Sequence, residues 1–123
     1  EVVHVQRLEA GEGIGYGSTY ITPEPMTIAT IPVGYADGYP RSLSNRGTVL
    51  IHGTRCPVVG RICMDQFMVA VPDTITVQPG DKVVLLGSQG HESISALEIA
   101  ALASTIPYEI FCGFSERVPR QYI

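Results

Sequence analysis

Residues 57–71 read PVVGRICMDQFMVAV, and this stretch decides the fold. Two apolar runs, residues 57–59 and 67–71, lie on either side of a segment that contains a cation, a thiol, a carboxylate and an amide, residues 60–66. Apolar runs of this length, rich in valine, predict two strands joined by a loop. Because rigid strands commonly present binding groups on such loops, residues 60–66 form a candidate site, although a solvated connection is the simpler interpretation.

The composition predicts one mainly β domain. Apolar residues make up 45% of the 123 residues and charged residues 16%, with 13 glycines and 9 prolines, which suits a chain with many tight turns. A chain of this size buries ~60–70% of the surface that it exposes when unfolded, so it needs no disulfide. The net charge of −4 and the lack of a basic run argue against nucleic acid as a partner. No apolar stretch reaches the ~20 residues of a membrane span, so we expect no membrane contact.

The cysteines predict neither a disulfide framework nor a metal site. Cys56, Cys63 and Cys112 are odd in number, and their spacing does not match a paired zinc motif. Reduced thiols are the simplest interpretation, and they predict a cytoplasmic location. His52 and Cys56 have a spacing that two metal ligands can have, but no second pair lies nearby, so we expect no metal.

Short runs of apolar and β-branched residues separated by turn residues predict further strands at residues 2–8, 27–33, 48–52, 55–62 and 82–86, with a turn at residues 78–81. Glycines at every second position from 11 to 17 predict a strand with one bare face, which carries Tyr16. No helix follows these glycines, so they do not form a phosphate loop. Tyr16 on such a strand is either a half-buried aromatic or a residue presented to a ligand. The predicted fold class is mainly β, a compact β-barrel-like domain.

One short α-helix is predicted near residues 95–105. Ser95 and Glu98 have the spacing of a capping box, in which the hydroxyl and the carboxylate each bind an amide at the helix start. An apolar stripe follows and Pro107 ends the helix; the stripe contains Leu97, Ala100, Ala101 and Leu102. A helix of this size would flank or plug a barrel.

Four stretches carry a family resemblance: residues 15–20 (GYGSTY), 34–41 (GYADGYPR), 60–66 (GRICMDQ), and 108–109 (YE) with 117–120 (RVPR). In this order they resemble the C-terminal β-domain of the pyridoxal-phosphate-dependent alanine racemases, over nearly the whole chain. The resemblance implies that residues 1–123 form that domain. The N-terminal (β/α)8 barrel, which carries the cofactor lysine in this family, is absent from this chain. Ala70 departs from the family pattern, since an acidic residue is expected there, at a position that we interpret as structural.

The resemblance also implies a reaction. Alanine racemases interconvert L- and D-alanine by means of two bases on opposite faces of the substrate, a lysine and a tyrosine, and Tyr16 corresponds to that tyrosine. A phenol with its ordinary pKa near ~10 is a poor base unless cations or hydrogen bonds stabilise the phenolate. In this family the barrel of one subunit meets the β-domain of the other in a homodimer, so Tyr16 would act in trans.

The other site residues follow from their motifs. The backbone amide of Met64 resembles the donor that binds the substrate carboxylate, and Tyr108 resembles a residue that contacts the phosphate of pyridoxal phosphate. Four more residues resemble those at the substrate entrance, although structural ion pairs would explain them equally well: Tyr35, Arg41, Arg61 and Asp65. Tyr35 and Met64 would act in trans, whereas Tyr108 would serve the barrel of its own chain. Cys63 would only line the site.

Three alternatives stay open. An apolar pocket rejects an added hydroxyl weakly, so a serine-preferring racemase is possible. A pyridoxal-phosphate-dependent amino-acid decarboxylase is a second alternative, against which the stretches at 34–41 and 60–66 argue. The third is a β-barrel interaction module without catalysis. The discriminating observation is whether the full-length gene encodes an upstream barrel with a cofactor lysine.

Overall fold

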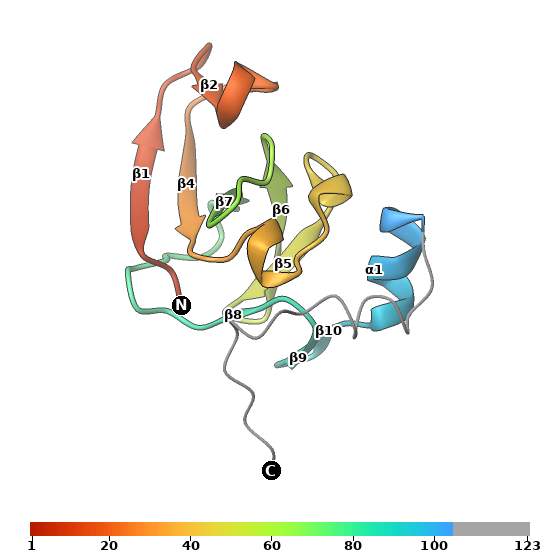
Figure 1. Cartoon of the computed structure of the whole chain (residues 1–123). Coiled ribbons are helices and arrows are strands. Elements are labelled where there is room, and N and C mark those ends of the chain that lie inside the picture. Colours follow the sequence, from red (N-terminus) through yellow and green to blue (C-terminus); the bar gives the residue numbers. More distant parts are fainter. Residues whose placement is uncertain (105–123) are drawn as a thin grey trace.

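The computed structural model describes residues 1–104, with the backbone alone for Tyr16, and within this range the strands form a curled antiparallel sheet (Figure 1). The sheet has six strands in the order β1-β4-β7-β6-β5-β8. Their bounds are β1 (His4–Leu8), β4 (Met26–Ile31), β5 (Thr48–Ile51), β6 (Thr54–Val59), β7 (Phe67–Val71) and β8 (Val83–Val84). Each lies within one residue of a predicted strand or inside it, and the predicted mainly β, barrel-like fold class is confirmed.

Backbone hydrogen bonds connect the segments that precede the two edge strands of this sheet, β1 and β8. Val2, which precedes β1, donates its N–H to the carbonyl of Asp81 at 2.9 Å and accepts from the N–H of Gly80 at 2.7 Å. Gly80 and Asp81 belong to the predicted turn before β8, which the N–H of Asp81 closes by donating to the carbonyl of Gln78 at 3.1 Å. The edge strands β1 and β8 are thereby linked through the segments that precede them, which leaves less open sheet edge.

Apolar side chains between Val2 and Ala100 form the main core. The largest buried side chain is Tyr39, whose ring stacks on Phe67 with centroids 4.8 Å apart and planes 8° apart. Burial raises the pKa of Tyr39 above its usual range, so this tyrosine is a neutral core residue. A second, smaller core cluster consists of Ile14, Ile28, Val59 and Ala70.

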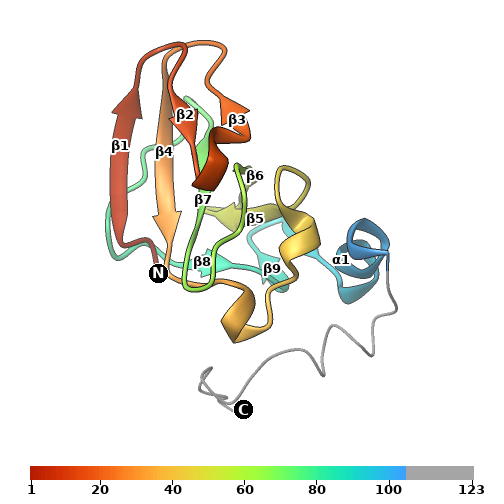
Figure 2. The ribbon, with the colours of Figure 1, turned by 45° about the horizontal axis from the view of Figure 1, so that its top comes forward.

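The glycine-rich segment is a hairpin rather than the predicted strand. β2 (Gly13–Ile14) pairs with β3 (Tyr20–Ile21), and a 3-10 turn, η1 (Tyr16–Ser18), lies between them. Gly15 and Gly17, on either side of Tyr16, both have φ of +76°, which glycine adopts without strain. The alternate glycines therefore permit a tight turn, and the prediction that Tyr16 lies on a strand was wrong. Through Ile14 the hairpin packs on the sheet beside β4 and β7 (Figure 2).

The connection from β4 to β5 contains two more 3-10 turns, η2 (Tyr35–Asp37) and η3 (Arg41–Leu43). Asp37 is buried, and its Oδ2 accepts the N–H of Gly34 at 3.0 Å, which ties the start of η2 to its end. Residues 34–41 thus contain η2 and the start of η3.

The predicted helix is α1 (Ala96–Ala103), in which the Ser95 Oγ accepts the N–H of Glu98 at 3.0 Å. Two details of the prediction were wrong. The Glu98 carboxylate binds Arg55 of the sheet and does not close a capping box, and Leu97 is 69% exposed, because the helix turns Ile99 and Ala100 to the core. Pro107, predicted to end the helix, lies outside the described residues. In the part of the chain that the structure describes, no helix has the length and apolar character of a membrane span.

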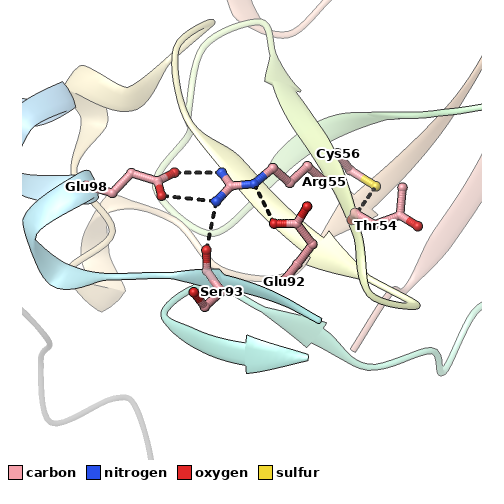
Figure 3. A network of polar contacts seen from close by, with 6 residues as sticks. All are labelled: Thr54, Arg55, Cys56, Glu92, Ser93 and Glu98. Carbon is pink, nitrogen blue, oxygen red and sulfur yellow. Dashed lines mark hydrogen bonds and ion pairs between the residues drawn. The ribbon is translucent and has the colours of Figure 1, made fainter. Parts of the chain in front are cut away.

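Arg55 on β6 fixes this helix to the sheet (Figure 3). Its Nη1 and Nη2 donate to the Glu98 carboxylate at 2.8 and 3.2 Å, its Nε donates to Glu92 at 3.1 Å, and Nη2 also donates to the Ser93 carbonyl at 2.7 Å. Glu92 and Ser93 belong to β10 (Glu92–Ile94), which pairs with β9 (Gly87–Gln89). A bidentate guanidinium contact defines orientation as well as distance, so one side chain links both α1 and the β9–β10 hairpin to the sheet.

Candidate functional site

A hollow of about 280 Å³ lies where the loop of residues 60–66 meets the two 3-10 turns. Its lining consists of Tyr35, Arg41, Arg61, Ile62, Cys63 and Met64. Four residues predicted to bind substrate are therefore brought together from two separate stretches of the sequence, residues 34–41 and 60–66. The fifth, Asp65, follows Met64 in the same loop and has an exposed side chain. Tyr108, predicted to contact the cofactor, lies outside the described residues.

Two backbone hydrogen bonds hold one wall of this hollow. The N–H of Tyr35 donates to the carbonyl of Cys63 and the N–H of Ala36 donates to the carbonyl of Met64, each at 3.0 Å. Gly34 allows this approach, because a Cβ at that position would overlap the carbonyl oxygens of both residues. The φ of Gly34 is −147°, in the extended range, so the close contact alone requires glycine there.

The same bonds orient the amide of Met64. All peptide bonds in the described residues are trans, and in a planar trans peptide the N–H points opposite to the C=O. Since the carbonyl of Cys63 points at Tyr35, the N–H of Met64 points away from that turn. Within residues 1–104 this N–H donates to no other group. The loop therefore presents a fixed, open backbone donor, which is the arrangement that binds an anion without reorganisation.

Two guanidinium groups give the hollow positive charge. The Cζ of Arg41 lies 5.8 Å from the centroid of the Tyr35 ring, a cation–π contact that holds both side chains at the rim. The ion pairs between described residues involve Arg7, His52 and Arg55, and neither Arg41 nor Arg61. Arg41 and Arg61 therefore form no ion pair with another described residue, and the structural ion-pair interpretation stays an alternative.

The turn that carries Tyr16 packs against the same loop. A Cβ on Gly15 would lie 3.0 Å from the backbone nitrogen of Arg61, and a Cβ on Gly60 would lie 2.8 Å from the carbonyl oxygen of Ile14. A Cβ on Gly17 would lie 3.6 Å from Nη1 of Arg61, so the guanidinium also borders the turn. Tyr16 is therefore held, by its backbone, beside the Arg61 end of the hollow.

Ser44 and Asn45 join these segments, and the sequence analysis did not identify them. Ser44 Oγ accepts the N–H of Ile62 at 2.8 Å and donates to the carbonyl of Arg41 at 2.6 Å. Asn45 Oδ1 accepts the N–H of Gly60 at 2.5 Å, and its Nδ2 donates to Thr19 Oγ1 at 3.3 Å. The available signal was the Ser-Asn dipeptide in a loop, since these side chains commonly bind backbone groups in turns.

A larger hollow of about 410 Å³ lies elsewhere, lined by His52, Gly53, Lys82, Gln89 and Gly90. Lys82 is the only lysine in the sequence, and His52 is engaged by Asp81, with 2.9 Å between Nε2 and Oδ2. We place the functional site in the smaller hollow, because chemistry and not volume identifies a site. The two guanidiniums and the open amide converge there.

The described thiols, Cys56 and Cys63, are free, as predicted for reduced cysteines, and Cys112 lies outside the described residues. Burial raises the pKa of Cys56 to about 11, which makes it an unreactive core residue. No group of three or more potential metal ligands among His, Cys, Asp and Glu occurs in the described part of the chain.

Comparison with known proteins places this architecture in a family. The model of the family "Alanine racemase, C-terminal domain" matches residues 1–122. The alanine racemase of Symbiobacterium thermophilum is 64% identical over 118 residues, which cover 96% of this chain and 31% of that protein.

Solved structures agree. The alanine racemase from Bacillus anthracis with bound L-Ala-P superposes with a TM-score of 0.94 at 48% identity, covering 99% of this chain and 31% of that one. The alanine racemase from Bartonella henselae with covalently bound pyridoxal phosphate has a TM-score of 0.91 at 40% identity, covering 99% and 33%. The chain thus spans about a third of the length of these relatives. The match along nearly its whole length shows that this chain belongs to the family of alanine racemase C-terminal domains.

Proposed function

We propose that residues 1–123 are the C-terminal domain of an alanine racemase, an isomerase that interconverts L- and D-alanine with pyridoxal phosphate. The relatives with this name are about three times as long as this chain, which supports an N-terminal barrel in the full-length enzyme. That barrel would supply the cofactor lysine. Lys82 does not suit this role, because it is exposed and lines the hollow away from the proposed site.

The residues of this domain fit the substrate side of such a site. The smaller hollow offers guanidiniums and a backbone N–H but no lysine, so it suits a carboxylate and not the covalent attachment of a carbonyl compound. Pyridoxal phosphate, when bound, supplies the electron sink that makes the α-hydrogen of an amino acid acidic. Tyr108 would contact its phosphate from within the same chain.

The observation that carries the proposal is the oriented N–H of Met64. It points away from the turn of Tyr35, it is held by the hydrogen bond from Tyr35 to Cys63, and it needs no particular side chain at position 64. We propose that this N–H binds the carboxylate of alanine. Four residues would guide the charged substrate at the entrance: Tyr35, Arg41, Arg61 and Asp65.

Tyr16 is the proposed base on the L face. The phenolate oxygen of Tyr16 takes the α-hydrogen of L-alanine as a proton, and the barrel lysine donates a proton to the opposite face to give D-alanine; the reverse reaction exchanges the two roles. Positive charge favours the phenolate that this requires, and the Arg61 guanidinium borders the turn that carries Tyr16. Since that turn also packs on the loop that carries Met64, the proposed base and the proposed carboxylate donor lie on adjacent segments of this domain.

A homodimer is part of the proposal, in which the β-domain of one subunit completes the barrel of the other. Tyr16, Tyr35 and Met64 would then act in trans. Tyr35 is 47% exposed and Met64 52% exposed, which suits a surface that another domain covers. The free thiols of the described residues support a cytoplasmic location.

Washout of an α-deuterium into water tests the role of Tyr16 in the full-length enzyme. Tyr16→Phe keeps the ring and removes the base, so racemisation should slow by ~10²- to 10⁴-fold in both directions. Deuterated L-alanine should lose its label far more slowly than in the wild type, whereas D-alanine, served by the lysine, should still exchange. Exchange of both enantiomers at the wild-type rate would refute the role. A wild-type enzyme that racemises serine in preference to alanine would favour the serine-specific alternative.

A further inference from the structure

We propose that Asn45 is a positioning residue of this site, which holds the turn that carries Tyr16 in register with the loop that carries Met64. The inference rests on the proposed function, because it takes Tyr16 as the base and the Met64 amide as the carboxylate donor. Asn45 itself lines no part of the hollow and contacts no reacting atom. Its proposed role is to set the distance between the turn of Tyr16 and the loop of Met64, which carry the groups that contact the substrate.

The side-chain amide of Asn45 bridges the two segments. Its Oδ1 accepts the N–H of Gly60, the first residue of the loop, and its Nδ2 donates to the hydroxyl of Thr19, the residue that follows η1. The orientation of the amide is determined by its partners, since a backbone N–H can only face the oxygen. One planar group therefore binds both segments at a fixed separation.

The backbone of Asn45 is suited to this bridge. Its φ is +58°, in the left-handed region, which among residues with a side chain Asn and Asp adopt most readily. Ser44 beside it accepts the N–H of Ile62 and donates to the carbonyl of Arg41. The dipeptide thus binds two alternate amides of the loop, at positions 60 and 62, and one carbonyl of η3.

Little else in the described residues fixes the turn against the loop. β2 and β3 are two residues long, and the hairpin is held to the sheet by Ile14, with Tyr20 packed against the same small cluster. At Gly60 the two backbones touch without intervening side chains, since even a Cβ would lie 2.8 Å from the Ile14 carbonyl oxygen. Such a contact prevents closer approach but not lateral sliding, which the Asn45 bridge opposes. A displacement of about 1 Å costs on the order of 10²-fold in rate when reacting groups must be aligned.

The main experiment uses Asn45→Gly in the full-length enzyme. Glycine keeps the left-handed backbone and removes both side-chain bonds. We expect the exchange of deuterated L-alanine to fall about tenfold or more, and that of D-alanine to change by less than about twofold, because the lysine lies in another domain. The amide hydrogen of Gly60 should also exchange faster with solvent, which is a readout independent of activity.

The matched control is His52→Gly. His52 is likewise a non-glycine residue in the left-handed region, with φ of +53°, and its side chain has one hydrogen-bond partner, Asp81, where that of Asn45 has two, but it lies at the other hollow. This variant should lose part of the stability that Asn45→Gly loses, and the ratio of its L-alanine exchange rate to its D-alanine exchange rate should stay that of the wild type. Asn45→Asp retains an acceptor for Gly60 and can accept the Thr19 hydroxyl, so it should restore most of the L exchange.

Thr19→Val removes only the hydrogen bond from Asn45 Nδ2 to the Thr19 hydroxyl. We expect it to slow the exchange of L-alanine, but less than Asn45→Gly does, and to leave the exchange of D-alanine nearly unchanged. Combined with Asn45→Gly it should add nothing further, because the bridge is already broken. The positioning role would be overturned if Asn45→Gly slowed the exchange of L-alanine and D-alanine equally, or if its ratio of L to D exchange rates matched that of His52→Gly. Full additivity of Asn45→Gly and Thr19→Val in the L-alanine exchange rate would also overturn it. A failure of the proposed function would be distinguishable, because the Tyr16→Phe variant would then exchange the α-deuterium of L-alanine at the wild-type rate.

Discussion

Replacing Gly34 with alanine tests whether close backbone contact builds the carboxylate-binding wall. The φ of Gly34 lies in the extended range, so alanine adopts the backbone conformation without strain. The added methyl group, however, would occupy the space of the Cys63 and Met64 carbonyl oxygens. Because both are backbone atoms, the clash is relieved only if the loop and η2 move apart.

The expected cost follows from what that movement breaks. The hydrogen bonds from Tyr35 to Cys63 and from Ala36 to Met64 contribute about 0.5–1.5 kcal/mol each. Overpacking adds roughly 1–3 kcal/mol, and the lower chain entropy of alanine returns about 0.4–1 kcal/mol. We expect a net loss of about 2–4 kcal/mol in the free energy of unfolding, or on the order of 10 °C in the melting temperature of a domain of this size.

Thermal unfolding of the 123-residue chain and the KM for alanine of the full-length enzyme measure the two consequences. The KM should rise, because the Met64 amide loses its orientation. Gly80→Ala is the control: its φ is +95° and a Cβ there would meet no atom within 4 Å, so it introduces backbone strain without a clash. It should destabilise by only about 1–2 kcal/mol and leave the KM unchanged. A Gly34→Ala protein with wild-type stability and KM would refute the reasoning.

Three further predictions concern the site, the core and the isolated chain. Met64→Leu should leave racemisation by the full-length enzyme nearly unchanged and Met64→Pro, which lacks the N–H, should abolish it in a protein whose circular dichroism shows the wild-type fold; equal tolerance would remove the carboxylate role. The raised pKa of Cys56 favours its protonated form in the folded state, so its contribution to stability is full below about pH 9 and falls by up to ~3 kcal/mol as the pH rises to about 11; Cys56→Ala should flatten this part of a denaturation series, and an unchanged slope would contradict it. The chain alone should fold but show neither an absorbance change with pyridoxal phosphate nor racemisation, and a band that Lys82→Ala abolishes would show the opposite.

Much of the fold could be predicted from local patterns. Residues 67–71 are β7 as predicted, because an apolar run between a polar loop and a proline has few alternatives to a buried strand. The helix was found from the Ser95 cap and apolar spacing. Residues 60–66 were identified as a candidate site from an unusual combination of side chains and residues 34–41 from a family resemblance, and the fold places the two segments side by side.

What failed were predictions that depended on distant partners. Tyr16 was placed on a strand because alternate glycines allow one, whereas packing of Gly15 and Gly60 against facing backbone favours the turn. Glu98 was assigned to its own helix cap, but Arg55, 43 residues away, binds both of its oxygens.

The sequence by itself determined the strands, the helix and the motifs, because hydrophobic period, caps and turn residues act over a few positions. Only the tertiary structure decided which groups meet. The orientation of the Met64 amide depends on a hydrogen bond to Tyr35, and the bridge at Asn45 depends on Thr19 and Gly60, all distant in the chain. Such contacts leave no local pattern, because any polar loop residue could make them until the curled sheet brings particular segments together.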